Sequence, residues 1–457
     1  MKDLLSLTFL GAAGTVTGSR YLLRTARRTV LVDCGLFQGY KTLRLRNRAP
    51  FPVAPAAIDR VVLTHAHLDH SGYLPLLVKT GYTGRIFCTP ATRDLAAVLL
   101  RDSGHLQERE ADLANRHGYT RHAPALPLYT EADAERAIER FSAVEFGRPY
   151  PMTEGVTATF RRAGHILGAA TVEIDAGGTS IVFSGDLGRG DSATMPPPEP
   201  VTHADYLVVE STYGNRRHDR ADPQDALAAV IERTAARGGT VLIPTFAVGR
   251  AQELLYHLAQ LKKRGRVSAA LPVFLDSPMA VDAAHIFRAH PNDHRLTPDE
   301  CRETCGVATY VRDVRESKAL NANDRPKIVL SASGMATGGR VLHHLETLAP
   351  DARNTILFAG FQAGGTRGAA IVGGAQAVKI HGRYVPIRAE VANLEMLSAH
   401  ADADEILAWL RRFERAPRMT FITHGEPAAA DALRVRVQDE LSWPCTVPDH
   451  LQRFALE

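Results

Sequence analysis

The chain has 457 residues, which is enough for two or three domain-sized units with substantial cores. Its composition, 45% hydrophobic and 23% charged, is that of an ordinary globular protein. A formal net charge of +4 is small for this length, so any surface for nucleic acid must be a local patch. No apolar run reaches membrane-spanning length, and no membrane partner is therefore expected.

The five cysteines are scattered along the chain, and Cys301 and Cys305 lack the second pair that a zinc knuckle needs. A sparse, odd number of thiols suits a reducing compartment. The first residues show no signal-peptide pattern, and we therefore expect a cytoplasmic protein.

Strand patterns dominate the first part of the chain, and polar side chains stand where these strands end. Asp33, His65, His165 and Asp186 each come just after an apolar strand, and Glu210 follows another. Open sheets place their active sites at such strand ends, so we expect these side chains to converge. The expected elements, in chain order, are strands 6–9, 21–23, 29–32 and 61–64, helix 73–79, strand 85–88, helices 90–116 and 130–142, and strands 156–161, 170–174, 180–183 and 206–209.

From about residue 212 helices and strands alternate, which is typical of a parallel-sheet α/β domain. After residue 389, His400 and His424 follow at places where the first domain would need polar residues. We therefore predict a domain of residues 212–388, inserted into a domain formed by residues 1–211 and 389–457. The expected elements are helix 225–237, strand 241–243, helix 250–263, strand 272–275, helix 281–288, strand 328–330, helix 340–348, strand 355–358, helix 403–413 and strand 419–422.

The segment from Leu63 to His70, Leu-Thr-His-Ala-His-Leu-Asp-His, holds four side chains that can bind a metal. Three imidazoles and a carboxylate are the nitrogen and hard oxygen donors that Zn²⁺ prefers. On a turn that leaves a strand, His65 and His67 can point to one side while Asp69 and His70 point to another, which indicates two metals. The alternative is a polar loop in which the histidines are accidental. Other histidines, such as His343, are expected to be ordinary surface or core residues.

Two Zn²⁺ per chain need about four protein donors each, less the positions left open for water. We expect Asp186 to bridge the two ions, because its two carboxylate oxygens can each face a cation. A water shared by ions roughly 3.5–4 Å apart would have its pKa lowered toward neutrality. Asp33 is expected to accept a ring N–H of a ligand histidine, unless it only forms a turn. The expected ligands are His65, His67 and His165 for one ion, and Asp69, His70 and His424 for the other.

The histidine segment, together with three later residues, resembles the signature of the metallo-β-lactamase fold. The resemblance implies an α/β protein built as an αββα sandwich with its metals at one edge of the sheets. Further motifs resemble those of the β-CASP nucleases, most closely the bacterial and archaeal relatives of the cleavage-and-polyadenylation endonuclease subunit, and imply an inserted parallel-sheet β-CASP domain. The residues that carry these resemblances are His65, His67, Asp69, His70, His165, Asp186 and His424 for the fold, and Glu210, His400 and His424 for the β-CASP motifs.

The resemblance implies a zinc-dependent ribonuclease that hydrolyses RNA in the cleft between the two domains and leaves a 5′ phosphate and a 3′ hydroxyl. In this family a histidine in the third extra motif, here His424, goes with RNA processing, whereas DNA-repair members have valine. The alternatives are a β-CASP DNA nuclease, a small-molecule metallo-hydrolase of the same fold and an inactive scaffold subunit. RNA is the expected partner, a homodimer is left open, and the sequence does not distinguish an endonuclease from a 5′ exonuclease.

His400 has two candidate roles, as a further metal ligand or as an imidazole that protonates the leaving 3′ oxygen. The ligand set is complete without it, so we favour the acid. Glu210 would then hydrogen-bond to His400 and raise its pKa, unless it only forms an ion pair at the end of a strand. Asp69 is expected to act in catalysis as well as in metal binding.

Two glycine-rich turns in the inserted domain each follow a predicted strand. Such turns present backbone N–H groups to an anion, although glycine turns can also merely reverse a chain. They also resemble the phosphate-contacting loops of the β-CASP family. The residues assigned to phosphate and RNA binding are Ser331, Ser333 and Gly334 in the first turn, and Gln362, Gly365 and Thr366 in the second.

Overall fold

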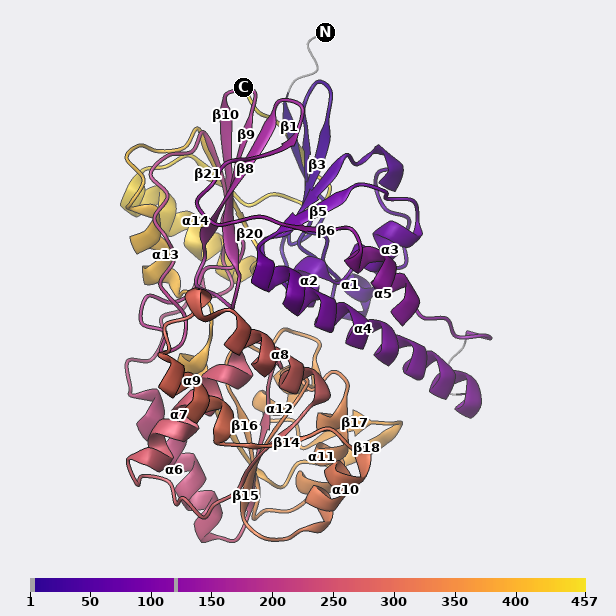
Figure 1. The fold of residues 1–457 in the computed structure, drawn as a ribbon, viewed down its shortest axis with the longest axis vertical. Coiled ribbons are helices and arrows are strands. Elements are labelled where there is room, and N and C mark those ends of the chain that lie inside the picture. The colour runs from indigo at the N-terminus through magenta and orange to yellow at the C-terminus, as the bar shows by residue number, and fades with distance from the viewer. Residues whose placement is uncertain (1–4, 119–121) are drawn as a thin grey trace. The chain divides into compact units, whose positions relative to one another are not determined.

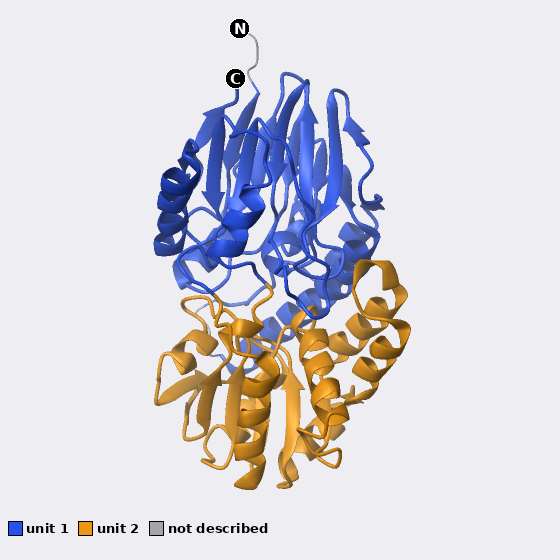
Figure 2. Cartoon of the chain, turned by 90° about the vertical axis from the view of Figure 1, so that its left-hand side faces the viewer, with its two compact units in different colours: residues 1–217, 400–457 blue, residues 218–399 orange. Residues whose placement is uncertain are grey.

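The computed structural model describes residues 5–118 and 122–457. The chain divides into two compact units, which Figure 2 draws in blue and orange. Unit 1 comprises Met1–Arg217 and His400–Glu457, and unit 2 comprises His218–Ala399. The second unit is therefore inserted into the sequence of the first.

Unit 1 is built from two seven-stranded sheets that share one apolar core. Aromatic side chains of both sheets meet in that core, where the ring centroids of Phe9 and Phe421 lie 5.1 Å apart. The strands of the first sheet are, in spatial order, β22 (Arg453–Ala455), β1 (Ser6–Phe9), β2 (Tyr21–Arg24), β3 (Thr29–Val32), β4 (Arg60–Val62), β5 (Arg85–Cys88) and β6 (Phe141–Ala143). Those of the second are β21 (Cys445–Thr446), β20 (Met419–Thr423), β11 (Tyr206–Glu210), β10 (Thr179–Phe183), β9 (Ala170–Ala176), β8 (Val156–Arg162) and β7 (Tyr150–Thr153).

Helices lie on the outer side of each sheet, so unit 1 has the four layers of the expected αββα sandwich (Figure 1). On the side of the second sheet, Leu407 and Leu433 pack against Leu207 of β11. The helices beside the first sheet are α1 (Lys41–Arg46), α2 (Leu68–Ser71), α3 (Leu74–Lys79), α4 (Pro90–His117) and α5 (Glu131–Ile138), and those beside the second are α13 (Ala403–Leu410) and α14 (Pro427–Leu441).

Helix α4 is set in place by its first turn. The Thr89 side chain caps the helix by accepting the Thr92 N–H, and Gly118 ends it in the left-handed conformation at φ 62°. The hydroxyls of Thr89 and Thr92 both donate to the Gly168 carbonyl, at 2.7 and 2.8 Å, and so tie the start of α4 to the loop that follows β8. Among the residues that the structure describes, no helix has both the length and the apolar character needed to cross a membrane.

Unit 2 is a six-stranded sheet in which every strand pairing is parallel, as the alternation of helices and strands predicts. Separate apolar clusters cover its two faces, one with Leu254 of α7 and the other with Leu345 of α11. The strands are, in spatial order, β14 (Thr309–Val311), β13 (Val273–Asp276), β15 (Lys327–Ser331), β12 (Thr240–Pro244), β16 (Thr355–Phe358) and β19 (Glu390–Asn393). The helices are α6 (Pro223–Ala236), α7 (Arg250–Lys263), α8 (Pro278–Ala289), α9 (Pro298–Gly306), α10 (Val314–Ala322), α11 (Arg340–Leu348) and α12 (Arg367–Val372).

The observed elements differ from the expected ones in three respects. The prediction of one helix over 130–142 is wrong beyond residue 138, because β6 follows there and pairs with β5. Phe141 is buried in this pairing, so a tertiary contact overrides the local helix preference. Unit 2 also extends past the expected boundary at residue 388, since β19 adds a strand to its sheet. Elements that the sequence analysis did not propose are α1, α2, α9, α10, α14, β6, β7, β14, β19, β21, β22 and the hairpin of β17 (Ala377–Ile380) and β18 (Arg383–Pro386).

A buried carboxylate joins two helices, α10 and α11, to the sheet of unit 2. Asp276, the last residue of β13, is completely buried and accepts hydrogen bonds from Ser317 Oγ, Arg340 Nη1 and His344 Nε2 at 2.5, 2.5 and 2.7 Å. Burial alone would raise the pKa of Asp276, but the hydrogen bonds from these three partners lower it below its ordinary value.

We expect Asp276→Asn to destabilise unit 2 by about 3–5 kcal/mol, because it leaves the partly buried charge of Arg340 without its buried partner. A carboxyl whose pKa falls on folding stabilises the folded state above the ordinary aspartate value of about 3.9, and this stabilisation is lost as the pH falls through the folded-state pKa. The difference between wild type and variant should therefore shrink below about pH 4. Urea unfolding at several pH values measures this difference in the free energy of unfolding.

Asp282→Asn, which removes the exposed ion pair with Arg312, is the control and should lower the free energy of unfolding by less than 1 kcal/mol, about the value of a surface pair.

Candidate metal centre

Strand ends from both sheets bring the expected donor residues together within unit 1. Asp33 follows β3, His65 follows β4, Asp186 follows β10 and His424 follows β20. Asp33 and His424 have positive φ angles of 58° and 48°, and this rare conformation turns the chain sharply away from each strand. The turns are held by two backbone hydrogen bonds of 2.8 Å. The N–H of Asp33 donates to the Val62 carbonyl, and the N–H of His424 donates to the Ala12 carbonyl.

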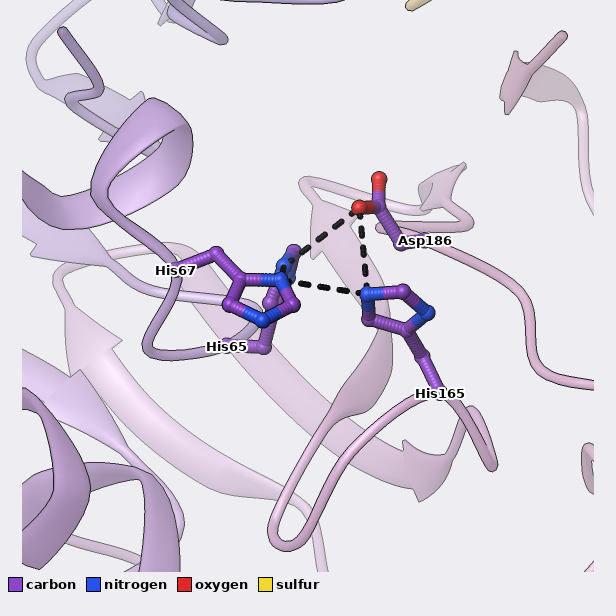
Figure 3. A group of neighbouring side chains, drawn as sticks. All are labelled: His65, His67, His165 and Asp186. Atoms are coloured by element: carbon purple, nitrogen blue, oxygen red, sulfur yellow. Dashed lines mark hydrogen bonds and ion pairs between the residues drawn. The ribbon is translucent and has the colours of Figure 1, made fainter. Parts of the chain in front are cut away.

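The first group of donors consists of His65, His67, His165 and Asp186, whose ligand atoms all lie within 4.8 Å of one another (Figure 3). His67 Nδ1 lies 3.2 Å from His65 Nε2 and 3.2 Å from His165 Nε2. The Oδ2 atom of Asp186 lies 3.4 Å from His65 Nε2 and 3.5 Å from His165 Nε2. Four donors from three strand ends therefore point at one position.

The second group consists of Asp69, His70 and His424. His424 Nε2 lies 3.2 Å from His70 Nε2 and 3.4 Å from Asp69 Oδ2. The other oxygen of Asp186, Oδ1, lies 3.2 Å from His70 Nε2 and 3.6 Å from His424 Nδ1. Asp186 thus faces the first group with one oxygen and the second with the other, which is the geometry of a bridging carboxylate.

The spacing of these atoms fits zinc. Zinc bonds of about 2.0–2.1 Å at tetrahedral angles place the ligand atoms roughly 3.4 Å apart. Burial lowers the pKa of His65 well below its usual value and that of His67 to about 4, so both rings are neutral and keep a lone pair for a metal. Burial would also lower the pKa of His70, but the charges of Asp186 and Asp33 outweigh it and raise this pKa well above its usual value. The buried carboxylates of Asp186 and Asp33 therefore favour a positive charge beside them, on His70 or on a metal ion.

Asp33 is positioned as the sequence analysis expected, behind a donor histidine. Its Oδ2 accepts a hydrogen bond from His70 Nδ1 at 2.8 Å, while its Oδ1 accepts the backbone N–H of Thr64 at 2.8 Å. With Nδ1–H held in this way, His70 presents Nε2 to the second donor group. Asp33 also forms the turn that the alternative interpretation proposed, so the two roles coincide.

Three hydroxyls that the sequence analysis did not single out complete this support. Thr64 donates to Asp33 Oδ2 at 2.9 Å and lies 3.2 Å from His65 Nδ1, and Ser19 Oγ lies 3.3 Å from His70 Nε2. Thr212 donates to the carbonyl of His424 at 3.2 Å and lies 3.1 Å from its Nδ1. Thr64 directly precedes His65, and Thr212 lies two residues after Glu210. This closeness to candidate site residues was the only feature of the sequence that could have predicted their role.

His400 and Glu210 make the contact that the sequence analysis predicts. His400 Nδ1 lies 3.2 Å from each carboxylate oxygen of Glu210, which is itself held by the backbone N–H of Leu187 at 2.6 Å. Burial would lower the pKa of His400, but the charge and hydrogen bond of Glu210, with smaller effects of Asp186 and Asp69, raise it. His400 Nδ1 is 4.0 Å from Asp186 Oδ2, so both candidate roles, acid and ligand, remain compatible with its position.

The two glycine-rich turns lie in unit 2 and contact each other. Gln362 Nε2 donates to the Gly334 carbonyl at 3.2 Å, and Ser333 Oγ lies 2.9 Å from the Thr337 hydroxyl near the surface. Ser331 is completely buried, and its hydroxyl donates to the Asp276 carbonyl at 3.2 Å. Thr366 caps α12 through its buried side chain, and Gly365 is exposed at φ 77°. Ser331 and Thr366 therefore stabilise the conformation of the turns. The other four residues lie nearer to solvent or offer only the polar groups of their backbone.

Three family descriptions match successive parts of the chain. The metallo-beta-lactamase superfamily matches residues 13–229, and the Beta-Casp domain matches residues 251–371. The Zn-dependent metallo-hydrolase RNA specificity domain matches residues 384–448, a range that contains His400 and His424. The matched parts together contain every donor residue of the two groups described above.

The chain is similar over most of its length to other proteins. Ribonuclease TTHA0252 of Thermus thermophilus is 38% identical over 428 residues, which cover 91% of this chain and 92% of that protein. Transcription termination factor FttA of Methanocaldococcus jannaschii is 31% identical over 441 residues, covering 92% of this chain and 67% of that protein. A solved structure of a protein of unknown function from Enterococcus faecalis V583 matches with a TM-score of 0.56 at 12% identity, over 99% of this chain and 100% of that one, which shows likeness of fold alone.

We expect His67→Ala to bind at least one zinc equivalent less than the wild-type chain, because only two imidazoles and a carboxylate would remain in its group. Equilibrium dialysis against Zn²⁺ followed by metal analysis measures this loss. His105→Ala, at an exposed position of α4, is the matched control and should bind as much zinc as wild type. Wild-type zinc content in His67→Ala would refute the ligand assignment.

Proposed function

Because the chain belongs to the β-CASP family of the metallo-β-lactamase superfamily, we propose that it is a ribonuclease that uses two zinc ions to hydrolyse phosphodiester bonds of RNA. The observation that carries the proposal is Asp186, whose two oxygens face two separate groups of donors. Two zinc ions held there supply a water of lowered pKa and positive charge for the oxygens of the phosphate. The remaining steps fall to side chains of unit 1.

Asp69 is proposed to orient the attacking water. It is the more exposed carboxylate of the donor groups, at 21% of its side chain compared with 2% for Asp186. Its Oδ2 atom lies beside His424 Nε2, so the carboxylate is held at the solvent side of the second group. An exposed carboxylate in this position can accept a proton from a water that attacks the phosphorus.

His400 is proposed to protonate the departing 3′ oxygen. Its side chain is 17% exposed and so can reach a substrate, while its Nδ1 atom is held by Glu210. Glu210 does not contact the substrate in this scheme and positions His400. The alternative is that His400, Glu210 and Asp186, whose ligand atoms lie within 4.8 Å, bind a metal together.

RNA is favoured as the substrate over DNA or a small molecule. The match to the RNA specificity domain spans the segment that supplies His400 and His424, and the similar Thermus protein is named as a ribonuclease. A small-molecule hydrolase would not account for unit 2, with its parallel sheet and its paired glycine-rich turns. An inactive scaffold subunit is disfavoured because every expected donor is present.

The glycine-rich turns are proposed to bind RNA phosphates. Ser333, Gly334, Gln362 and Gly365 offer a hydroxyl, an amide and backbone N–H groups, which are the neutral donors that phosphate oxygens accept. The turn that contains Ser333 precedes α11, so the partial positive charge of that helix N-terminus adds to the attraction.

We expect His400→Ala to keep its zinc and its affinity for RNA but to lose activity by roughly 10²–10⁴, the usual contribution of a positioned proton donor. Single-turnover cleavage of a labelled RNA measures the loss, with metal analysis of the same sample. An RNA whose scissile 3′ oxygen is replaced by sulfur should be largely spared, because a thiolate leaves without a proton at neutral pH.

Two results would contradict the acid role of His400. Equal damage to the oxygen and sulfur substrates would mean that His400 does not protonate the leaving group, and loss of a zinc equivalent would make it a ligand. Glu210→Gln tests the positioning role and should give a milder loss that is again confined to the oxygen substrate.

Ser333→Asp should weaken RNA binding while leaving the zinc content unchanged, because it places a negative charge where a phosphate is proposed to bind. Filter binding at low salt, with inactive His400→Ala protein as the background, measures the affinity. Ser268→Asp, which adds the same charge at another exposed position of unit 2, is the matched control. Equal affinities for the two variants would remove this turn from the RNA surface.

A further inference from the structure

Unit 2 contains a second kind of polar cluster, which the proposed chemistry does not use. His343 and Glu346 lie one turn apart on α11, and His381 lies in the turn that joins β17 to β18. Figure 1 shows α11 beside this hairpin, and the contact between His381 and Glu346 confirms that the two elements touch. The cluster is formed by two elements that are far apart in the sequence.

The donor atoms of this cluster converge. His381 Nδ1 lies 3.1 Å from one oxygen of Glu346, and His343 Nδ1 lies 3.6 Å from the other. The two imidazole rings are stacked with centroids 4.8 Å apart and planes at 28°, and the ligand atoms of all three residues lie within 4.8 Å of one another. Tetrahedral zinc ligands are roughly 3.4 Å apart, so only small side-chain rotations separate this arrangement from a metal site.

The turn at the tip of the hairpin directs His381 at α11. His381 and Gly382 form a two-residue turn between the paired residues Ile380 and Arg383, with φ angles of 45° and 84°. Histidine is among the residues that adopt positive φ, and here its ring is directed at Glu346.

The Nδ1 atoms of both rings lie beside the same carboxylate, at one edge of the stacked pair. A metal ion at this edge would be bound by two nitrogen lone pairs and by Glu346 together. Burial lowers the pKa of His343, and the neighbouring His381 lowers it further, which favours the neutral ring that a metal needs.

We propose that His343, Glu346 and His381 bind a further divalent metal ion of the zinc class, separate from the donor groups of unit 1. Two imidazoles and one carboxylate suit Zn²⁺, Co²⁺ or Ni²⁺ rather than Mg²⁺ or Ca²⁺, which prefer oxygen ligands alone. The side chains are 64%, 31% and 43% exposed, so water can fill the remaining coordination positions.

Such an ion would fasten the β17–β18 hairpin to α11. Arg367 already joins the hairpin to the first glycine-rich turn, by donating to the carbonyls of Lys379 at 2.7 Å and Thr337 at 3.1 Å. The metal would add a second link, from the tip of the hairpin to the helix that follows the turn. The proposal concerns the architecture of unit 2 and stands whether or not the chain cleaves RNA.

Equilibrium dialysis of the full chain against Zn²⁺, followed by metal analysis, tests the proposal. The measured quantity is the difference in bound zinc between the wild-type chain and each variant. Wild type should hold one zinc equivalent more than His381→Ala and one more than Glu346→Gln. His285→Ala, which removes an exposed histidine from α8 of the same unit, is the matched control and should hold as much as wild type. Because the comparison is a difference, it does not depend on how many ions unit 1 binds.

Hydrogen exchange supplies a local readout. Zn²⁺ should slow amide exchange in residues 377–386 of wild type and of His285→Ala but not of His381→Ala, since the ion links this hairpin to α11. Glu346→Gln keeps the size of the side chain, so it separates loss of the ligand from loss of packing. Equal zinc content in wild type and both cluster variants, or equal slowing of exchange in all chains, would overturn the proposal.

Discussion

The buried carboxylate of Asp186 is the group on which the arrangement of unit 1 depends. It is 2% exposed and faces imidazoles through both of its oxygens. An isolated charge at such depth costs several kcal/mol in practice, so it persists only where positive charge or a metal surrounds it. This requirement explains why strand ends from two different sheets stop at one place, each with a histidine or a carboxylate just beyond the strand.

The residues around these donors restrict how the rings can turn. Asp33 and Thr64 hold His70 and His65 by their Nδ1 atoms, and Thr212 lies beside Nδ1 of His424. Each of these rings is thereby left with Nε2 directed at the site, so the choice of nitrogen is made before a metal arrives. Glu210 does the same for His400, whose position depends on a carboxylate that is itself fixed by backbone N–H groups. Catalysis by positioned groups relies on this kind of preorganisation.

Unit 2 uses the same physical device for a different purpose. Asp276 also lies at the end of a parallel strand, but its partners are a serine, an arginine and a histidine from two helices, and the result is a connected scaffold rather than a metal centre. Arg340, which it holds, is the first residue of the helix that follows the first glycine-rich turn. The polar network and the metal cluster proposed at the hairpin would both act to keep that turn in one conformation.

The sequence by itself determined the list of candidate donors and the parallel sheet of the inserted domain, because ligand chemistry and hydrophobic periodicity are local properties. His65, His67, Asp69 and His70 stand within six residues, and the alternation after residue 212 requires a parallel sheet. Only the tertiary structure decided which oxygen of Asp186 faces which histidine and that Ser331 is buried. It also ended α5 before β6 and brought His381 to Glu346, 35 residues away along the chain. These features depend on packing between distant segments, and neither spacing nor residue type carries that information.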